Sequence, residues 1–486
     1  MTNDSWTSLD PVDSRSIREC GHQMLDDMFD YVESIRERPV WQPIPSAVRQ
    51  SFREAMPKAP TSLAIAHAKF MENVLPYAVG NAHPRFMGWV HGGGTAVGML
   101  AEMLAAGLNA NLGGRDQMPL EVERQIVAWM RDLFGFPETA NGVFVTGSSM
   151  ANLIGVLAAR TRILGTGSRH GGVVDGPQLV AYAATTAHGC IARAMEIAGL
   201  GTAALRRVPV DDRHQLDAAA LARLIAADRQ AGLVPFFVAA TAGTVDIGAV
   251  DDLDAVAAVA EREQVWFHVD GALGALAMLA PDVAPLMHGI DRADSIALDF
   301  HKWGQVPYDA GFVLLRDGQD QLDTFASPAD YLARHPRGLG AGSPWPCDLG
   351  PDLSRGFRAL KTWFTLVVHG TDKLGAAISH SCALARYLAE RVEATPELEL
   401  LAPVTLNIVC FRYRCADPDT VNADIVADLQ ESGIAVPSTT VIDGRLAIRA
   451  ALVNHRTLAQ DIDALVAATV AFGSRRTCLS TLREAA

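Results

Sequence analysis

The chain has 486 residues, too many for one small hydrophobic core, which suggests two or three structural units. Apolar residues make up 49% of the chain and charged residues 20%, the balance of a well-packed globular protein. The net charge of −14 argues against nucleic acids and anionic membranes as partners, because both bind clustered lysine and arginine.

The seven cysteines are odd in number and scattered, and no two of them form a C-x-x-C pair. This pattern fits reduced thiols better than a disulfide framework or a zinc site, so we expect no bound metal. The N-terminus lacks the basic and apolar regions of a signal peptide, and no run approaches the roughly 20 apolar residues of a membrane span. We therefore expect a soluble, cytoplasmic protein with no membrane partner.

Two amphipathic helices are predicted near the N-terminus. Apolar residues recur at steps of three and four between residues 16 and 35, and a second helical run extends from about Leu63 to Leu75. Helices of this size cannot bury their apolar faces alone. Residues 1–82 are therefore expected to dock on the main body or on another subunit.

Residues 83–368 are predicted to form a large domain, in which short apolar runs alternate with alanine-rich helical stretches. The seven candidate strands are 143–146, 179–183, 204–208, 236–241, 265–269, 295–300 and 312–315. This order predicts an α/β fold with a seven-stranded, mainly parallel sheet covered by helices on both faces. In such sheets ligands bind at the carboxyl ends of the strands.

A smaller α+β domain is predicted over residues 369–486. It follows a turn-prone stretch rich in proline and glycine, from Ser327 to Asp352, and a helix around 357–368. Residues 406–413 and 444–450 have the pattern of strands, and 456–471 that of a closing helix.

Two of the candidate strands in the large domain end in polar side chains that could contact a ligand. Ser148 and Ser149 follow the first strand at the start of a predicted helix, where backbone N–H groups and hydroxyls attract anions. Plain helix capping by either serine is the alternative, and for this motif alone it is the simpler one. His188 closes the next strand, where a lone histidine is more often structural.

Two later strands end in charged side chains. Asp270 lies at the end of a buried strand, where a carboxylate needs a cationic or hydrogen-bonding partner or else caps the following helix. Lys302 follows an apolar strand in which Ile296, Leu298 and Phe300 share one face. Its amine is either a nucleophile toward carbonyl groups, activated by burial, or a surface amine that reaches water.

Together these groups match the needs of one cofactor, pyridoxal phosphate. A lysine forms a Schiff base with it, a carboxylate keeps its pyridine nitrogen protonated, and a helix start takes its phosphate. A histidine can stack on its ring. Each signal is weak alone, but all four stand at strand ends, so we predict pyridoxal phosphate as the cofactor.

At these residues the sequence resembles the group II pyridoxal-phosphate decarboxylases, the aromatic amino acid and glutamate decarboxylase family. The resemblance runs from His83-Pro-Arg-Phe86 to about Trp363 and depends most on the motifs His-Val-Asp-x-Ala, ending at Ala272, and His-Lys-Trp, ending at Trp303. It implies the type I pyridoxal-phosphate fold, which is aspartate aminotransferase-like. It also implies a homodimer with shared active sites.

The resemblance gives each candidate residue a role. Lys302 is the cofactor lysine, and Asp270 is the partner of the pyridine nitrogen. His188 stacks on one face of the cofactor ring, and the methyl group of Ala272 lies against the other. The further cofactor contacts that it implies are Ser148, Ser149 and His301 at the phosphate and Thr244 near the ring.

Tyr331 lies in the turn-prone stretch, which resembles the mobile catalytic loop of this family. There a tyrosine of the neighbouring subunit protonates the substrate carbon after carbon dioxide leaves. An exposed loop tyrosine without a catalytic role is the alternative if the resemblance is set aside.

The sequence departs from the family pattern near the cofactor. Met150 replaces an acidic residue, and Val245 replaces the second threonine of a Gly-Thr-Thr segment. Asp299 and Phe300 replace the common Asn-Pro before His-Lys. If Asp299 approaches the phosphate the two anions repel, so we expect this side chain to turn aside or to pair with an arginine.

The predicted substrate pocket departs further. Glycines at 92–94 and 113–114 stand where aromatic-selective relatives carry bulky side chains, and their lack of side chains is expected to widen the pocket. The residues predicted to line the pocket are Phe86, Trp89, His91, Asn109 and Asn111. The two aromatic residues favour an aromatic substrate, whereas the polar ones, or Arg115, suit a polar or acidic one.

We therefore expect a carbon–carbon lyase that uses pyridoxal phosphate to decarboxylate an L-amino acid, preferably an aromatic one, to the amine and carbon dioxide. One alternative is a decarboxylating aldehyde synthase, in which the loop tyrosine is replaced; Tyr331 argues against it. The other is a decarboxylase of an acidic or polar amino acid.

Overall fold

The larger of two β-sheets forms the centre of the molecule. The computed structural model describes residues 9–11, 13–327 and 333–484. The strands of the larger sheet are β2 (Asn141–Val145), β3 (Leu179–Ala184), β4 (Leu205–Val208), β5 (Val234–Thr241), β6 (Trp266–Asp270), β7 (Ser295–Asp299) and β8 (Gly311–Leu315). Their order is β2-β8-β7-β6-β5-β3-β4, and only β8 runs antiparallel to its neighbours. The predicted seven-stranded, mainly parallel sheet is confirmed.

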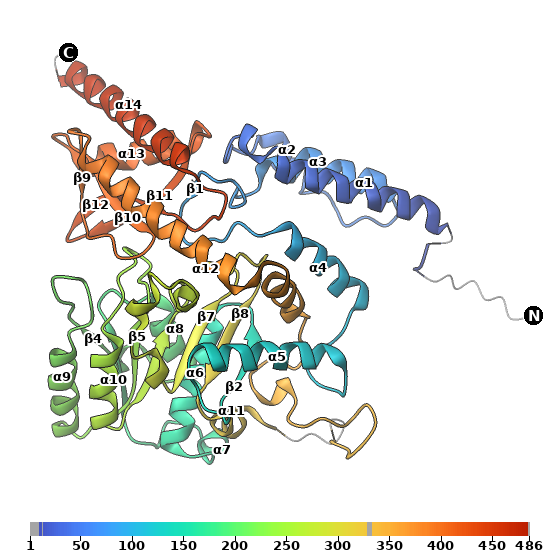
Figure 1. Cartoon of the computed structure of the whole chain (residues 1–486), viewed down its shortest axis with the longest axis vertical. Coiled ribbons are helices and arrows are strands. Elements are labelled where there is room, and N and C mark those ends of the chain that lie inside the picture. The colour runs from blue at the N-terminus through green and yellow to red at the C-terminus, as the bar shows by residue number, and fades with distance from the viewer. Residues whose placement is uncertain (1–8, 12, 328–332, 485–486) are drawn as a thin grey trace, which may run out of the picture.

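Helices cover both faces of this sheet (Figure 1). One face carries α6 (Ser148–Leu164), α8 (Gly189–Ile197) and α11 (Gly318–Phe325). The other carries α5 (Met118–Leu133), α9 (Ala218–Gln230), α10 (Leu253–Arg262) and the first part of α12 (Arg358–Glu393). The strands alternate between two hydrophobic clusters: Ile296, Leu298 and Phe300 belong to the second face and Ala297 to the first. The predicted alternation along this strand is confirmed.

Four of the five strands of the smaller sheet follow the kink in α12 at Gly370, where the backbone leaves helical geometry, and the first strand precedes it. The strands of this sheet are β1 (Phe86–Met87), β9 (Leu398–Leu400), β10 (Ile408–Tyr413), β11 (Val436–Ile442) and β12 (Arg445–Ala451), in the order β1-β11-β12-β10-β9. Two further helices, α13 (Pro418–Glu431) and α14 (Ala459–Glu484), pack with it. The sequence did not indicate β1, because two residues are too few for a periodic pattern.

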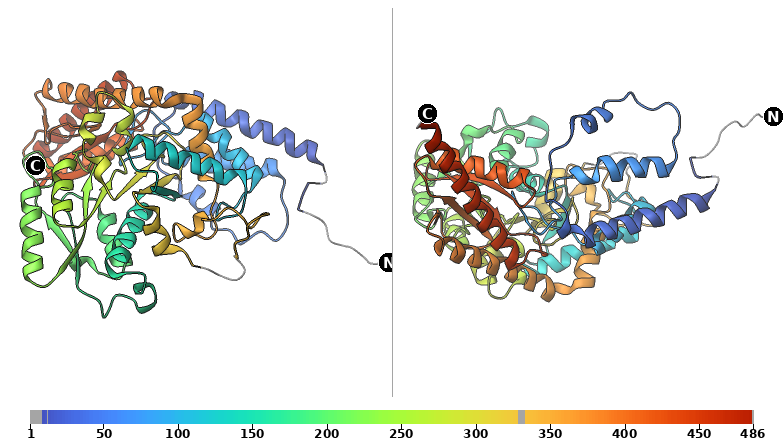
Figure 2. Two further views of the ribbon diagram at one scale, coloured as in Figure 1. Left: turned by 60° about the horizontal axis from the view of Figure 1, so that its bottom comes forward. Right: turned by 90° about the horizontal axis from the view of Figure 1, so that it is seen from above.

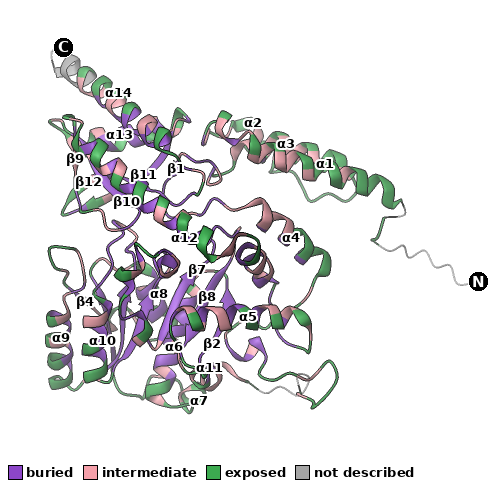
Figure 3. Cartoon of the chain, in the orientation of Figure 1, coloured by how far each residue is buried: buried purple, intermediate pink, exposed green. Residues whose placement is uncertain are grey.

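The N-terminal helices project from the body (Figures 1 and 2). No residue of α1 (Ser14–Glu33), α2 (Ser46–Ser51) or α3 (Leu63–Asn73) is buried, although all of these residues are described (Figure 3). Large apolar side chains such as Ile65 and Phe70 are exposed, as are Met103 and Leu108 on α4 (Ala96–Leu108). These helices therefore leave apolar surface uncovered, and docking on another subunit stays a prediction.

The remaining elements are short. They are α7 (Ser168–Gly171) and the 3₁₀ turns Ile35–Glu37, Leu75–Tyr77, Thr202–Ala204, Ala275–Leu279, Ala284–Met287, Ile290–Arg292 and Pro346–Asp348. Aspartate side chains at 217, 252 and 317 accept N–H groups at the starts of α9, α10 and α11. Within the described ranges, no helix combines the length and apolar character that crossing a bilayer requires.

Candidate active site

A cavity of about 320 Å³ lies where β2, β3, β5, β6 and β7 end. The predicted cofactor residues that line it are Ser148, Ser149, His188, Asp270, Ala272, His301 and Lys302. Thr244 is buried nearby, and its Oγ1 accepts the N–H of Ala249 at 3.0 Å, while its neighbours Gly243 and Val245 line the cavity. Residues that are far apart in the sequence thus meet at one edge of the sheet, as expected of parallel strands.

Lys302 turns into this cavity just beyond β7. Its Nζ lies 2.9 Å from Oδ2 of Asp299, and its side chain is 19% exposed while that of Asp299 is 4% exposed. The amine is therefore mostly withdrawn from water and held by a buried carboxylate, which does not fit the alternative of a surface lysine.

The start of α6 forms the wall opposite Lys302. The helix begins after Gly147 without a side-chain cap, so the alternative that Ser148 or Ser149 caps it is wrong. The N–H of Ser148 donates instead to Oδ1 of Asp299 at 2.7 Å. Our expectation that Asp299 turns aside or pairs with an arginine is also wrong, because this carboxylate lies at the helix start, between Ser148 and Lys302.

Asp270 occupies the end of β6, deep in the cavity. Its Oδ1 accepts the N–H of Ala272 at 3.2 Å, and its Oδ2 lies 3.8 Å from Sγ of Cys190. Burial raises the pKa of Asp270, and the nearby Lys302 ammonium opposes this effect. The buried carboxylate of Asp270 thus needs a positively charged partner to stabilise its charged form.

A chain of buried hydrogen bonds leads to Asp270 from within the core. Cys190 receives the side-chain amide N–H of Asn152 at 3.1 Å, and the carbonyl oxygen of Asn152 lies 2.6 Å from Nε2 of His268. Burial lowers the pKa of His268 to about 3, so its ring is neutral and carries one proton. Because the amide oxygen can only accept, that proton is on Nε2.

The chain continues from His268 to the opposite edge of the sheet. Nδ1 of His268 accepts from the hydroxyl of Ser295 at 2.7 Å, and that oxygen accepts the indole N–H of Trp266 at 2.8 Å. Every donor in the chain therefore points toward Asp270. Hydrogen bonds aligned in this way polarise one another, which favours negative charge at the carboxylate.

The two histidines predicted to contact the cofactor differ in their surroundings. His188 is exposed and begins α8, where its Nδ1 accepts the N–H of Cys190 at 3.2 Å. His301 is buried, and its Nδ1 accepts the N–H of Ala310 at 3.0 Å. Burial lowers the pKa of His301, although Asp299 opposes the shift. A neutral His301 then carries its proton on Nε2, 3.6 Å from Asp299.

The comparison with protein families now decides what this site belongs to. Residues 45–414 match the model of the pyridoxal-dependent decarboxylase conserved domain. The chain belongs to the pyridoxal-dependent decarboxylase family. The predicted cofactor, pyridoxal phosphate, and the predicted class of enzyme, a carboxy-lyase, are both confirmed.

Individual relatives and solved structures agree with this family. The chain is 32% identical to an aromatic-L-amino-acid decarboxylase of Bacillus atrophaeus, over 93% of this chain and 94% of the relative. It is 28% identical to a phenylacetaldehyde synthase of Arabidopsis thaliana, with the same two coverages. A crystal structure of Oryza sativa TDC with PLP and tryptamine superposes with a TM-score of 0.89 at 26% identity, covering 97% of this chain and all of that one. The predicted type I fold is confirmed.

Aromatic rings flank the cavity of this decarboxylase. The ring of His91, which lines the cavity, lies 5.5 Å from that of Phe86 and 5.7 Å from that of Tyr308. Trp89 lies 6.2 Å from His91 and is largely exposed. Phe86 and Trp89 therefore stand behind His91 rather than in the cavity wall, and their part in substrate binding stays a prediction.

The two predicted asparagines lie elsewhere. Asn109 is exposed and ends α4 in a left-handed conformation. The side-chain oxygen of Asn111 accepts the N–H groups of Gly113 and Arg355, at 2.9 and 3.0 Å. Neither side chain lines the cavity of the described chain. Arg115 stacks over the ring of Trp345 instead.

Several cavity residues were missed from the sequence. They are Val90, Thr146, Asn152, Cys190, Thr241, Leu273 and Tyr308. A signal existed for Asn152, which lies one helical turn after Ser148 and so faces the same side. Tyr308 gave none, because it lies in an irregular segment after β7. The predicted proton donor, Tyr331, lies outside the described residues.

The glycines near the site permit close packing rather than a wide pocket. The N–H of Gly92 donates to the carbonyl oxygen of His301 at 3.1 Å, and a methyl group at residue 92 would overlap the carbonyl oxygens of His301 and Lys302. A side chain at Gly114 would overlap the ring of Trp345. Close packing therefore explains why glycine occupies positions 92 and 114, without a wider pocket.

We expect Gly92→Ala to destabilise the protein by about 1–3 kcal/mol and to weaken cofactor binding, because the added methyl group must displace the backbone that carries Lys302. Urea denaturation and an absorbance titration with pyridoxal phosphate measure the two effects. Gly107→Ala is the matched control, since its methyl group meets no atom within 4 Å in α4, and a gain of up to about 1 kcal/mol is expected. Equal effects of both substitutions would contradict this packing argument.

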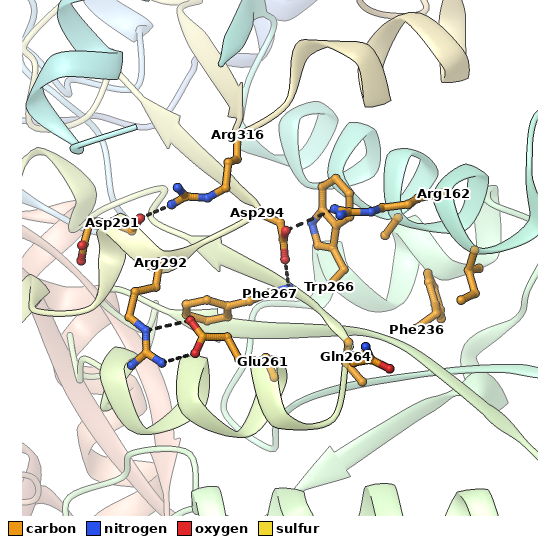
Figure 4. Close-up of a pocket in the computed structure, with 14 residues that line it drawn as sticks. Arg162, Phe236, Glu261, Gln264, Trp266, Phe267, Asp291, Arg292, Asp294 and Arg316 are labelled. Atoms are coloured by element: carbon orange, nitrogen blue, oxygen red, sulfur yellow. Dashed lines mark hydrogen bonds and ion pairs between the residues drawn. The ribbon is translucent and has the colours of Figure 1, made fainter. Parts of the chain in front are cut away.

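A larger cavity, of about 660 Å³, lies at the opposite edge of the sheet (Figure 4). Its charged side chains pair with one another: Arg292 with Glu261 at 2.6 Å, and Arg162 with Asp294 at 3.3 Å. Trp266, the far end of the hydrogen-bond chain, lies in its wall. The charges of this larger cavity are neutralised, and the cavity lies at the amino ends of β6 and β7. The smaller cavity, at the carboxyl ends of the strands, is therefore the candidate active site.

Proposed function

We propose that this chain decarboxylates an L-amino acid, preferably an aromatic one, to the amine and carbon dioxide, and that it acts as a homodimer. The observation that carries the proposal is the meeting of Lys302, Asp270 and His188 in one cavity at the ends of three strands. These side chains match the three requirements of the cofactor: a nucleophilic amine, an anionic partner for the pyridine nitrogen and a ring that stacks.

The start of α6 fits the phosphate group of the cofactor. The hydroxyl of Ser148 is buried and has no hydrogen-bond partner in the described part of the chain. Together with Ser149 and the Nε2–H of His301, it provides donors at the start of α6, where the N–H of Ser148 is bonded to Asp299. Such a set is what an anionic group at a helix N-terminus requires.

Each remaining side chain has a chemical task in this proposal. When bound, pyridoxal phosphate supplies an electron sink for the pair left by the departing carboxylate. Lys302 would hold the cofactor covalently through its amine. Asp270, favoured in its charged form by the donors that point toward it, keeps the pyridine nitrogen protonated. His188 and the methyl group of Ala272 hold the ring from its two faces, with Thr244 close by.

Preference for an aromatic substrate is supported by the rings beside the cavity and by the relatives. His91 and Tyr308 present ring edges and faces next to the cavity, with Phe86 and Trp89 behind them. Such rings stack on an aromatic side chain at little cost in entropy. The similarity to the phenylacetaldehyde synthase of Arabidopsis thaliana makes oxidative decarboxylation the second candidate function.

The homodimer is supported by the uncovered apolar surface. Apolar side chains on α1, α3 and α4 are exposed in the single chain, and exposed apolar surface favours a protein interface. In this proposal Tyr331 of one subunit protonates the substrate carbon in the site of the other.

A panel of amino acids tests the proposal. Release of carbon dioxide and amine in equal amounts from tryptophan, tyrosine, phenylalanine or dihydroxyphenylalanine is the expected result. Release of ammonia and hydrogen peroxide in equal amounts would favour the aldehyde synthase instead. Turnover of glutamate or aspartate alone would overturn the proposed preference for aromatic substrates. The proposed dimer is tested separately, by measuring the molecular mass in solution by sedimentation equilibrium.

We expect Cys190→Ala to weaken pyridoxal-phosphate binding by about three- to tenfold, because it removes the donor that faces Asp270 and leaves the amide N–H of Asn152 without its acceptor. Cys190→Ser keeps both functions and is expected to restore the affinity. An absorbance titration measures the binding. Loss of affinity in both variants would indicate that the thiol acts through its size alone.

A further inference from the structure

The carboxylate of Asp299 occupies the position of an anion at the start of α6. One oxygen accepts the N–H of Ser148 at 2.7 Å, and the other lies 2.9 Å from Nζ of Lys302. The helix has 17 residues and no side-chain cap of its own, so its positive end is neutralised by a side chain from β7.

The donors at this point exceed what Asp299 uses. Ser148 is 5% exposed, and its hydroxyl is buried without a partner in the described chain, although its backbone N–H is bonded to Asp299. The Nε2–H of His301 approaches the same carboxylate only to 3.6 Å. The site is therefore built for an anion with more oxygens than one carboxylate, and Asp299 fills it partly.

Asp299 and a phosphate group need the same donors. The titratable groups that face Asp299 are Lys302 and His301 beside it, Tyr308 from the following segment and Asp270 from β6. Burial alone raises the pKa of Asp299, but Lys302, His301 and Ser148 outweigh it and hold the pKa below its ordinary value. A phosphate group in the site would reverse this balance, because it would add negative charge and because the amine of Lys302 would be taken by the cofactor.

We propose that Asp299 is a proton-linked stand-in for the cofactor phosphate. In the cofactor-free protein its carboxylate occupies the anion position. In the loaded protein it takes one proton from solvent on a carboxyl oxygen and, as a neutral acid, donates a hydrogen bond to the phosphate. This inference depends on the assignment of Ser148 and Lys302 to the cofactor site, and it makes cofactor affinity fall as the pH rises.

Asp299→Asn tests the proposal, because an amide is a neutral donor at every pH. In the wild-type protein the affinity for pyridoxal phosphate is expected to fall by up to about tenfold per pH unit between pH 7 and 9. The variant should lose this slope and bind at least about tenfold more tightly at pH 8.5. Pyridoxal, which lacks the phosphate, should bind equally to both proteins.

Asp294→Asn is the matched control variant. It removes one negative charge from the amino end of β7, where Asp294 pairs with Arg162 at the far edge of the sheet. This variant is expected to keep the wild-type slope. An equal change in both variants would show an effect of net charge and overturn the proposal.

The number of protons taken up on cofactor binding can be measured on the wild-type protein alone, so this second test does not depend on the folding of a variant. Calorimetry in buffers of different ionisation enthalpy should give about one more proton taken up with pyridoxal phosphate than with pyridoxal above pH 7.5. An infrared difference spectrum of the wild-type protein should show a protonated carboxylic acid on loading. Tight binding with no proton uptake and no such band would overturn the proposal, whereas the absence of any binding at any pH would instead overturn the proposed function.

Discussion

Lys302→Ala is expected to abolish the visible absorbance of the cofactor-loaded protein and to lower decarboxylation by at least about 10³-fold. The amine of Lys302 is the one in the cavity that is both withdrawn from water and held beside the predicted phosphate position. Without it no covalent link to the cofactor forms there. An absorbance scan after incubation with pyridoxal phosphate, followed by dialysis, measures the first effect.

Lys302→Arg separates the covalent role of this residue from its charge. A guanidinium group keeps a cation beside Asp299, but it stays protonated and is no nucleophile. We expect the arginine variant to lack the absorbance band as the alanine variant does, yet to unfold at nearly the wild-type temperature. A band that survives in either variant means that another lysine binds the cofactor, which would remove the basis of the proposed function.

The second large effect is expected in the free energy of unfolding, from the loss of a buried ion pair. Arg355 and Glu123 form an ion pair at 2.5 Å, with side chains that are only 2% and 4% exposed. Arg355 also donates to the carbonyl oxygens of Leu112 and Phe144, at 2.9 and 2.8 Å, and thereby holds β2, the strand that leads to the anion site. Arg355→Met leaves the carboxylate of Glu123 buried and unpaired, so we expect a loss of about 3–5 kcal/mol in the free energy of unfolding.

Urea denaturation measures this loss, and two further variants interpret it. Arg131→Met removes the ion pair with Asp132 on α5, the helix that carries Glu123. The Asp132 side chain of this pair is 70% exposed, so the substitution is expected to cost less than about 1 kcal/mol. In the double variant Glu123→Gln with Arg355→Met, part of the stability should return, since no unpaired charge remains. A double variant that is as unstable as the sum of its single substitutions would show that the two side chains act independently.

The strand ends of the fold could be predicted from the sequence because their signals are local. The alternation of Ile296, Leu298 and Phe300 defines a buried strand by itself, and the polar residue that follows such a strand must lie at the edge of the sheet. Parallel pairing then brings Ser148, His188, Asp270 and Lys302 together without any knowledge of side-chain geometry.

Other parts of the site could not be predicted, since they depend on contacts between distant segments. Cys190 carries no functional signal in the sequence, and only the packing of α6 and α8 on β6 joins it with Asn152 and His268 in one hydrogen-bond chain. Asp299 looked misplaced beside a phosphate because its interaction with the start of α6 is invisible in the sequence. Gly92 suggested empty space, although its backbone lies against that of His301.

The kink in α12 lets one helix pack against both parts of the molecule. The first part of this helix packs on α4 and α5, while the second part packs on α14 and the smaller sheet. At Gly370 the backbone adopts a φ of 75°, a left-handed conformation that glycine reaches without strain. The two parts of one helix thus pack against the larger and the smaller sheet, and the change of direction between them lies at this residue.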